Sequence, residues 1–444
     1  MDKVDLLIKN GEVLTPDGLK RAGVAIHGET ILAIDVEHNL PSGVEEIDAD
    51  GKLIIPGFID SHVHFREPGF TYKEDWETGS KAAAAGGVTM VVGMVNTDPP
   101  PKSLEVYKQH IEIAKSKSVV DFNHWALPTD LGEVPKIAEA GTVGYKFFMK
   151  SAHYPYGSDT SIVNEAEILY MLKEVKKTGL PVLVHPYSQD IWEYKVKKWT
   201  EEGKTNLMDY RELTHGDHHI LHTIAIAKIV LLGNAVGAQV RPLHIQGRDQ
   251  IKTVRALRDG GYRFVTEANP WGLFRIDPIT VIGSEDENWE ALNDGTIDLI
   301  ATDHAPHTRD DFEKAKKNVL SSVVVGYPLV EHYMSLYLTE VNKRISLERL
   351  SWLCSENVAR HLGVYPRKGI IQVGSDADLA IVDMKQKKTL GKDYPVYSKM
   401  GFTPLEGREV QGIPVCTIVR GKVVMKDGKI MASPGYGKFI KPTK

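Results

Sequence analysis

A chain of 444 residues, 42% hydrophobic and 25% charged, has the composition of a soluble globular protein and the length for one large domain plus a smaller one. Its net charge of -5 offers no basic surface for nucleic acid or an anionic membrane, and two cysteines are too few for a disulfide framework. The N-terminus lacks the residue order of a signal peptide, and the apolar run from Ile224 to Leu232 is short for a membrane span and interrupted by Lys228. We expect a cytoplasmic protein that binds neither nucleic acid nor membrane.

Both ends of the chain show short strands joined by tight turns. Near the N-terminus, Asn10-Gly11 and Pro16-Asp17-Gly18 are turn signals between apolar runs. Near the C-terminus, residues 376–383 indicate a strand and residues 417–430 a hairpin. Neither end has enough strands to bury a face alone, so we predict one small β-domain built from residues 1–52 and 366–444, the latter including the tail.

Between the two ends, residues 53–365 alternate apolar strands with helical segments. The strand that ends at His62 continues the apolar run of residues 53–56. Seven further strands are expected at 88–95, 119–125, 143–149, 181–185, 242–245, 263–266 and 297–302. Expected helices include 77–85, 103–116, 161–177, 249–259, 329–339 and 346–353. Such alternation predicts a parallel α/β sheet, and eight units predict a closed (β/α)8 barrel.

Side chains that can bind a metal ion stand at the ends of these strands, where the active sites of such barrels lie. His62 and His64 are two residues apart on an extended segment, so both imidazoles leave the same face. The full set is His62, His64, Lys146, His185, His244 and Asp303. Two divalent ions would explain this set, one held by His62, His64 and Asp303 and the other by His185 and His244.

Two neighbouring cations need a bridging anion, and Lys146 offers one. The pKa of a buried lysine near cations is depressed, and its neutral amine can react with carbon dioxide to form an anionic carbamate. A buried Lys146 paired with Asp303 or Asp60 explains the sequence equally well. Zinc is the metal that best suits a mixed set of nitrogen and oxygen ligands.

The six residues match the binuclear metal pattern of the amidohydrolase superfamily, position by position. The chain resembles the cyclic amidase branch of that superfamily, which holds dihydroorotases, allantoinases, hydantoinases and dihydropyrimidinases. The resemblance covers nearly the whole chain, including residues 374–378. It implies a TIM-like barrel with a small β-sandwich, a carboxylated Lys146 and a homo-oligomer, either a dimer or a tetramer.

The same resemblance implies a mechanism. A hydroxide that bridges the two ions would attack the carbonyl of a cyclic amide ring while one ion polarises that carbonyl. Asp303 would take the proton from the hydroxide and pass it to the leaving nitrogen.

Three further residues favour a dihydroorotase. Arg66, Asn96 and His307 occupy positions that resemble the dihydroorotase motifs, and in those enzymes they bind the substrate carboxylate. A guanidinium, an amide and an imidazole make a suitable carboxylate socket. We therefore expect the interconversion of dihydroorotate and N-carbamoyl-aspartate, a step of pyrimidine biosynthesis.

Other features favour an allantoinase or a hydantoinase/dihydropyrimidinase, which act on related ureide rings. Residues 145–149 and 435–439 resemble those enzymes, and residues 326–328 depart from the glycine-rich segment of dihydroorotases. Against a hydantoinase, the tyrosine that such enzymes carry after the metal lysine is Ser151 here, although Tyr154 and Tyr156 are close.

Two non-enzyme alternatives are an inactive scaffold relative and a closed structural zinc site. A catalytically inactive scaffold relative should have lost metal ligands, and a closed structural zinc site needs no bridging lysine. His218, His219 and His222 are spaced for one helix face but do not follow a strand, so we expect a solvated or interface surface there. We expect His304 to point away from the site.

Overall fold

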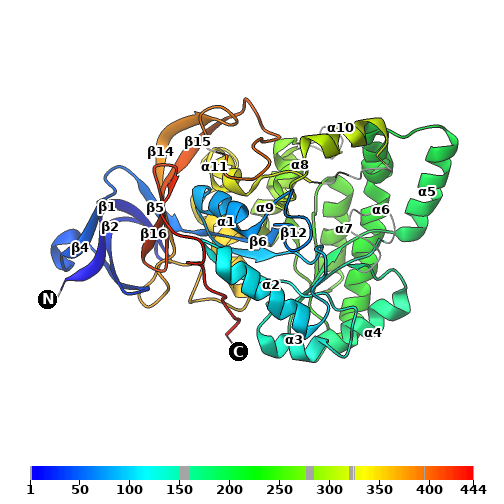
Figure 1. Cartoon of the computed structure of the whole chain (residues 1–444), viewed down its shortest axis with the longest axis horizontal. Helices are drawn as coiled ribbons and strands as arrows, with labels where there is room; N and C mark the ends of the chain where they lie inside the picture. Colours follow the sequence, from blue (N-terminus) through cyan, green and yellow to red (C-terminus); the bar gives the residue numbers. More distant parts are fainter. Residues whose placement is uncertain are drawn as a thin grey trace.

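The computed structural model describes residues 3–150, 160–276, 285–319, 324, 326–394 and 396–443. A helix-wrapped barrel forms one side of the molecule, and a sheet built from both chain ends lies beside it (Figure 1). The expected α/β class and its TIM-like barrel are both present.

In the described residues, eight parallel strands form the barrel: β6 (Phe58–Val63), β7 (Val88–Gly93), β8 (Asp121–His124), β9 (Tyr145–Phe148), β10 (Val182–His185), β11 (Val240–Pro242), β12 (Glu267–Ala268) and β13 (Leu299–Ile300). Their hydrogen-bonded ladders run in the orders β6-β7-β8, β11-β10-β9 and β12-β13. Backbone hydrogen bonds close the remaining gaps: Lys146 N donates to Ala126 O at 2.9 Å, Ile245 N to Glu267 O at 2.8 Å and His64 N to His304 O at 2.7 Å.

The helices follow the strands and cover the outside of the barrel (Figure 1). They are α1 (Trp76–Ala85), α2 (Leu104–Lys117), α3 (Val134–Ala140), α4 (Glu165–Lys176), α5 (Gln189–Glu201), α6 (Leu207–Val236), α7 (Arg248–Asp259), α8 (Pro270–Phe274), α9 (Glu285–Asn293), α10 (Arg309–Lys317), α11 (Tyr333–Leu338), α12 (Leu347–Ser351) and α13 (Asn357–His361). The short turns η1 (Glu37–Asn39) and η3 (Val330–His332) are 3-10 helical, and η4 (Trp352–Glu356) is π-helical.

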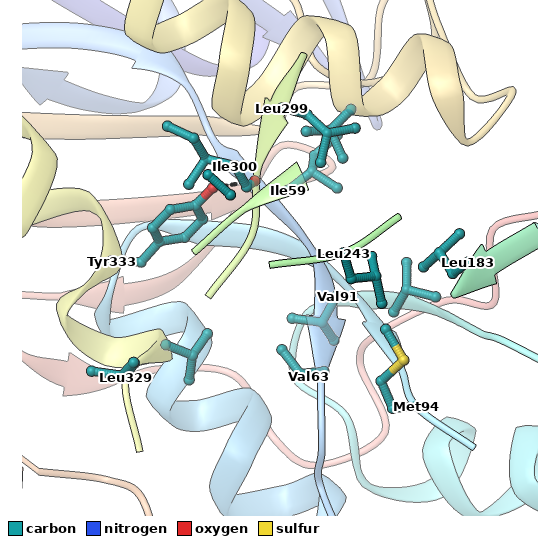
Figure 2. Packing of buried hydrophobic residues seen from close by; sticks show 14 of the residues in the cluster. Ile59, Val63, Val91, Met94, Leu183, Leu243, Leu299, Ile300, Leu329 and Tyr333 are labelled. Carbon is teal, nitrogen blue, oxygen red and sulfur yellow. Dashed lines mark hydrogen bonds between the residues drawn. The ribbon is translucent and has the colours of Figure 1, made fainter. Parts of the chain in front are cut away.

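Apolar side chains from several strands fill the barrel and its contacts with the helices. Figure 2 shows part of this core, where Ile59 of β6, Val91 of β7 and Leu183 of β10 are buried. Tyr333 of α11 donates its hydroxyl to the carbonyl of Ile300 in β13 at 2.7 Å (Figure 2). The core therefore ties the outer helices to the strands that carry the candidate ligands.

One segment of α6, His218–Val236, is long and apolar enough to cross a membrane by length and composition. The sequence did not lead us to expect such a run. Leu221, Ile226 and Val230 are nonetheless buried, and the helix packs on α4, α7 and β11. It is an outer helix of the barrel whose inner face is covered by protein.

The chain ends form a second sheet in which nine strands are described, with the order β17-β16-β15-β14-β5-β1-β2-β3 and β4 paired to β1. These are β1 (Val4–Thr15), β2 (Gly18–His27), β3 (Thr30–Asp35), β4 (Gly43–Asp48), β5 (Leu53–Pro56), β14 (Leu379–Thr389), β15 (Glu409–Val419), β16 (Lys422–Lys426) and β17 (Lys429–Ile430). The β-domain is thus built from both termini, with β5 joining the two halves.

The sheet curls over its own core. Strand β3 lies at the end of the sheet order, yet Ile31 N donates to Ser375 O at 2.9 Å just before β14. Side chains of β1 to β3 and of β14 and β15 share one apolar cluster, including Ile8, Val24 and Ile418. Each half supplies the face that the other half needs to bury.

Three strand boundaries differ from the sequence prediction. Residues 53–56 form β5 of the end sheet and are separate from β6. The strand is interrupted at Gly57, where Thr89 leaves no room for a side chain. Strand β11 ends before the predicted 242–245, since His244 has a left-handed φ of 60° that cannot continue a strand. Strand β12 begins after the predicted 263–266, at Glu267.

Candidate metal centre

The carboxyl ends of the barrel strands bring the predicted ligands together. His62 lies in β6, Lys146 in β9 and His185 ends β10. His244 and Asp303 follow β11 and β13 with φ values of 60° and 52°. Non-glycine residues seldom adopt this left-handed backbone, and such strain is concentrated at functional sites.

Three of the residues converge on one point. Asp303 Oδ1 lies 3.2 Å from His62 Nε2 and 3.2 Å from His64 Nε2, and the two imidazole nitrogens are 3.3 Å apart. His62 Nδ1 lies 2.6 Å from Glu267 Oε1, and His64 Nδ1 lies 2.5 Å from Asn96 Oδ1. In its neutral form each imidazole therefore carries its proton on Nδ1 and turns the lone pair of Nε2 toward Asp303. Two lone pairs and a carboxylate that face one another form a site for a cation.

The charges around His62 favour a cation at the same place. Burial lowers the pKa of His62, but the carboxylates of Asp303 and Glu267 outweigh it and raise that pKa above its usual value. Burial also tends to raise the pKa of Asp303, but the neighbouring His62 and His244 hold it well below its usual value. Asp303 is therefore ionised at neutral pH.

A second pair of nitrogens adjoins the first group. His185 Nδ1 lies 3.1 Å from His244 Nε2, and His244 Nδ1 lies 3.6 Å from Asp303 Oδ2. Burial lowers the pKa of His244 to about 4 and that of His185 well below its usual value. Both imidazoles are neutral and can act as ligands, and one ligand atom each from His62, His244 and Asp303 fits around a single ion.

Lys146 is fully buried beside these groups. Within the described residues, its Nζ has no hydrogen-bond partner and makes no ion pair with Asp60 or Asp303. Asp60 instead accepts hydrogen bonds from the backbone N–H groups of His62 and Thr302, both at 3.1 Å. Burial lowers the pKa of Lys146 to about 7, so a large share of the amine is neutral at neutral pH. These features fit an amine available for carbamate formation and give no support to the paired-lysine interpretation.

Two buried residues that the sequence analysis missed hold His62 in place. Glu267 accepts from His62 and also from Arg241, which donates a second bond to Ser61 Oγ at 2.6 Å. Burial opposes ionisation of Glu267, but Arg241 and His62 lower its pKa to about 2. A carboxylate on the far nitrogen of a ligating histidine fixes the tautomer and the ring orientation. The sequence offers one sign of this orienting contact, which is the presence of an arginine, Arg241, within an apolar strand.

The residues predicted to hold a carboxylate lie next to the metal candidates. Arg66 Nη2 lies 3.3 Å from His307 Nε2, and both side chains are buried. Lys73, which the sequence analysis did not single out, approaches His307 Nδ1 at 3.1 Å. Asn96 contacts His64 through its amide oxygen. The structure thus brings Arg66 and His307 together and places Asn96 against a candidate ligand.

A cavity of about 70 Å³ opens beside His185, His244 and Asp303. Its other described lining residues are Lys150, Tyr187, Tyr210, Thr214, His215, His222, Gln246, Asn269, Trp271 and Val324. Half of these are aromatic or imidazole rings, so a planar ligand has suitable surfaces to lie against. Arg66, Asn96 and His307 do not line it.

The prediction for the three histidines of α6 was wrong in part. His219 and His222 are buried rather than solvated, and His222 lines the cavity. His218 is exposed and contacts Asp249 at 3.1 Å. Left-handed φ values of 58° at His218 and 55° at His219 turn the chain within α6, which a regular helical periodicity does not show.

His304 points away from the metal candidates, as expected. Its Nδ1 accepts hydrogen bonds from the backbone N–H groups of Leu329 and Val330, at 3.0 and 3.2 Å. Ser151, Tyr154 and Tyr156, which bear on the hydantoinase interpretation, lie outside the described residues.

Comparisons with known proteins identify the family of the chain. A model of the amidohydrolase family matches residues 53–424. The chain is 32% identical to a dihydroorotase from Lactobacillus helveticus, covering 95% of this chain and 99% of the relative. It is 30% identical to an allantoinase from Rubrobacter xylanophilus, covering 100% of this chain and 98% of the relative. The solved structure of an L-hydantoinase (dihydropyrimidinase) from Arthrobacter aurescens is similar with a TM-score of 0.91 and 28% identity, covering 99% of this chain and 100% of that chain. The chain therefore belongs to the amidohydrolase family, as an enzyme of its cyclic amidase branch.

Proposed function

We propose that this enzyme is a dihydroorotase, which opens the dihydroorotate ring to N-carbamoyl-aspartate and closes it again. The observation that carries the proposal is the buried contact between Arg66 and His307 next to the metal candidates. Burial lowers the pKa of His64 to about 3, and the charge of the Arg66 guanidinium acts in the same direction. A buried cation beside a reaction centre suits a substrate that carries a carboxylate.

We further propose that His62, His64, His185, His244, Asp303 and a carboxylated Lys146 hold two divalent ions, most suitably zinc. The lone pairs and the ionised carboxylate that face one another at 3.1 to 3.3 Å support this ligand set. When bound, the ions would polarise the ring carbonyl and lower the pKa of a water molecule.

The protein residues supply the remaining steps. Arg66 and His307, together with Asn96, take the ring carboxylate and orient the ring. Asp303 stays ionised at neutral pH, so its carboxylate can take a proton from the attacking water and deliver it to the leaving nitrogen. Asn269 Nδ2 lies 3.5 Å from Asp303 Oδ2 and can steady that carboxylate. Glu267 and Arg241 keep His62 in its orientation.

The second candidate is an allantoinase or hydantoinase. Two observations support it: the TM-score of 0.91 to an L-hydantoinase structure, and the aromatic lining of the cavity by Tyr187, Tyr210 and Trp271. Such a lining suits a ring with a neutral or apolar substituent.

A substrate panel with Arg66→Met separates the two candidates. A charge-assisted hydrogen bond contributes about 1.5–3 kcal/mol, so the variant should lose roughly tenfold to a hundredfold in kcat/KM on dihydroorotate. It should change little on hydantoin or dihydrouracil, whose rings lack the carboxylate. Arg248→Met is the matched control, because that arginine is exposed on α7 and pairs with Glu287.

Two results would refute the proposal. Equal losses on charged and neutral rings would assign Arg66 to the fold or the metal centre. A wild-type enzyme that prefers hydantoin, allantoin or dihydrouracil to dihydroorotate would establish the second candidate.

Two broader proposals accompany this function. The buried thiols of Cys354 and Cys416 fit a reducing compartment, so we place the enzyme in the cytoplasm.

Self-association as a dimer or tetramer is proposed from the family resemblance, and light scattering of the purified enzyme tests it.

A further inference from the structure

One wall of the cavity beside the metal centre has no part in the function proposed above. Lys150 stands two residues beyond the end of β9, the strand that carries Lys146. It is only 2% exposed and lines the cavity together with His185 and His244. A buried amine is therefore part of the same wall as two of the candidate ligands.

Lys150 is held in one position. Its Nζ donates to Tyr210 Oη at 2.7 Å and lies 4.7 Å from the ring centre of Tyr187 and 4.5 Å from that of Trp192. Burial lowers the pKa of Lys150 to about 7, and the amine remains a hydrogen-bond donor in either protonation state. Tyr210, also a lining residue, fixes the direction of this donor.

Two more polar groups of the same cavity point to a ligand. His222 Nδ1 and Gln246 Oε1 are buried, and neither finds a hydrogen-bond partner within the described part of the chain. The side chains of His222 and Gln246 are 7% and 6% exposed. Leaving such atoms unpaired costs free energy, so a bound group that satisfies them is expected.

The three groups differ in what they bind. Lys150 can donate in either protonation state and His222 can donate from Nδ1, whereas Gln246 Oε1 accepts. A ligand that satisfies all three needs a carbonyl oxygen next to an N–H group. A carboxylate lacks the N–H and an alkyl substituent lacks both. A secondary amide has this pattern, and in a cyclic ureide the ureido group, N–C(=O)–N, supplies it apart from the carbonyl that is attacked.

We propose that Lys150, His222 and Gln246 form a subsite for the ureido edge of the substrate ring, the part that is not attacked and that becomes the carbamoyl group of the product. Lys150 and His222 donate to the ureido oxygen, Gln246 accepts from a ureido N–H, and Tyr210 orients Lys150. The inference rests on the proposed hydrolysis of a cyclic ureide. It predicts that rings that contain N–C(=O)–N are preferred to simple lactams, whose single amide is the bond that is attacked.

The experiment changes the protein and the ligand together. Wild type, Lys150→Met and Tyr210→Phe are assayed, metal-replete, on dihydroorotate, dihydrouracil and hydantoin. Each ring is also tested as its 2-thio analogue, in which sulfur, a weak acceptor, replaces the ureido oxygen. Lys150→Met should lower kcat/KM by roughly tenfold to a hundredfold on every oxygen ring that the wild type hydrolyses, because the lost bond is common to all. It should also remove most of the preference for oxygen over sulfur.

The second variant and the control separate binding from folding. Tyr210→Phe keeps the ring and loses only the hydroxyl, so KM should rise several-fold with kcat nearly unchanged. Metal content should equal that of wild type in both variants, since neither residue is a candidate ligand. Lys177→Met serves as the matched control, because that lysine is exposed and pairs with Glu174.

The outcomes distinguish this inference from the proposed function. A Lys150→Met enzyme with unchanged kcat/KM, or with an intact oxygen preference, overturns the subsite alone. A loss confined to dihydroorotate overturns it as well and assigns Lys150 to the carboxylate socket. If Lys150→Met does not fold, an unchanged KM in Tyr210→Phe overturns the subsite. A wild type that hydrolyses none of the rings overturns the proposed function and this inference together.

Discussion

Burial sets the protonation state of the side chains around the candidate metal centre. It lowers the pKa of His64 to about 3, that of His244 to about 4 and that of Lys146 to about 7. The two imidazoles are neutral at neutral pH, and so is a large share of the amine. Neutral nitrogen is the form in which histidine binds a metal and lysine reacts with carbon dioxide. The fold thus holds these candidate ligands in the protonation state that metal binding requires.

Asp303→Asn tests the proton-transfer role of Asp303. The amide keeps the shape of the side chain but cannot take a proton, so turnover should fall by at least roughly a hundredfold. Circular dichroism and the melting temperature should remain close to wild type, and metal analysis shows whether the ions are retained. A variant with a near-normal rate would contradict the assignment.

Lys146→Ala tests the bridging role of Lys146. The variant should lose activity, because the anion between the two ions is gone and a cavity replaces the side chain. Added short-chain carboxylic acids such as acetate or propionate should restore part of the activity by entering that cavity as bridging anions. Lys146→Met, which fills the cavity, is the control and should not respond. Full activity of Lys146→Ala without added acid would show that no bridge from residue 146 is needed.

The sequence predicted the candidate ligands because each stands at a strand end and has a distinctive chemistry. It did not predict Glu267, Arg241 or Lys73, because an orienting contact joins residues far apart in the chain and has no spacing of its own. His219 and His222 were assigned to a solvated surface because helical periodicity cannot show that the backbone of α6 turns at His218. Residues that act through tertiary contacts are the ones that sequence reasoning misses.

Among the elements, the sequence located β7 well and misplaced β11 and β12. Strand β7 was expected within 88–95 and occupies Val88–Gly93. Strands β11 and β12 comprise three and two residues, too few for a periodic pattern to locate. The split between β5 and β6 depends on the close approach of Thr89 to Gly57, which only the folded chain reveals.

The turn η3 holds a buried carboxyl group whose ionisation opposes folding. Glu331 is fully buried, and its Oε2 accepts from Tyr397 N at 2.7 Å. Burial, together with the nearby Glu74 carboxylate, raises the pKa of Glu331 to about 8. The folded protein therefore keeps a proton on Glu331 that the unfolded chain releases near pH 4.5.

This difference predicts how stability depends on pH. Because the folded state binds one more proton between about pH 4.5 and 8, the free energy of unfolding should fall as the pH rises through that range. Glu331→Gln stays neutral at every pH and should flatten this part of the curve. Urea unfolding of both proteins from pH 5 to 9 measures it, with the exposed Glu348→Gln of α12 as the control. Parallel curves for wild type and Glu331→Gln would disprove the role of Glu331.

At the scale of the whole molecule, a buried ionic network joins the barrel to the end sheet. Lys368 Nζ lies 2.5 Å from Asp121 of β8, 2.6 Å from Asp378 and 2.9 Å from Asp376, both just before β14. Arg420, between β15 and β16, adds a contact of 3.0 Å to Asp121. Asp121 is the first residue of β8, so the network lies at the end of the barrel opposite the metal candidates.

Lys368→Met should therefore weaken the whole molecule and leave the chemistry alone. Removing the lysine leaves three buried carboxylates whose described cationic partners are Arg420 at Asp121 and the partly exposed Arg367 at Asp376, and breaking a buried ion pair in this way costs about 3–5 kcal/mol. Urea unfolding should show a loss of that size, while kcat/KM of the folded enzyme stays near wild type. Lys387→Met is the matched control, because it breaks an exposed pair with Glu409 and should leave stability nearly unchanged. If both variants lose the same small amount, the network does not hold the two parts together. If kcat/KM falls while stability is kept, the network acts on the metal centre instead.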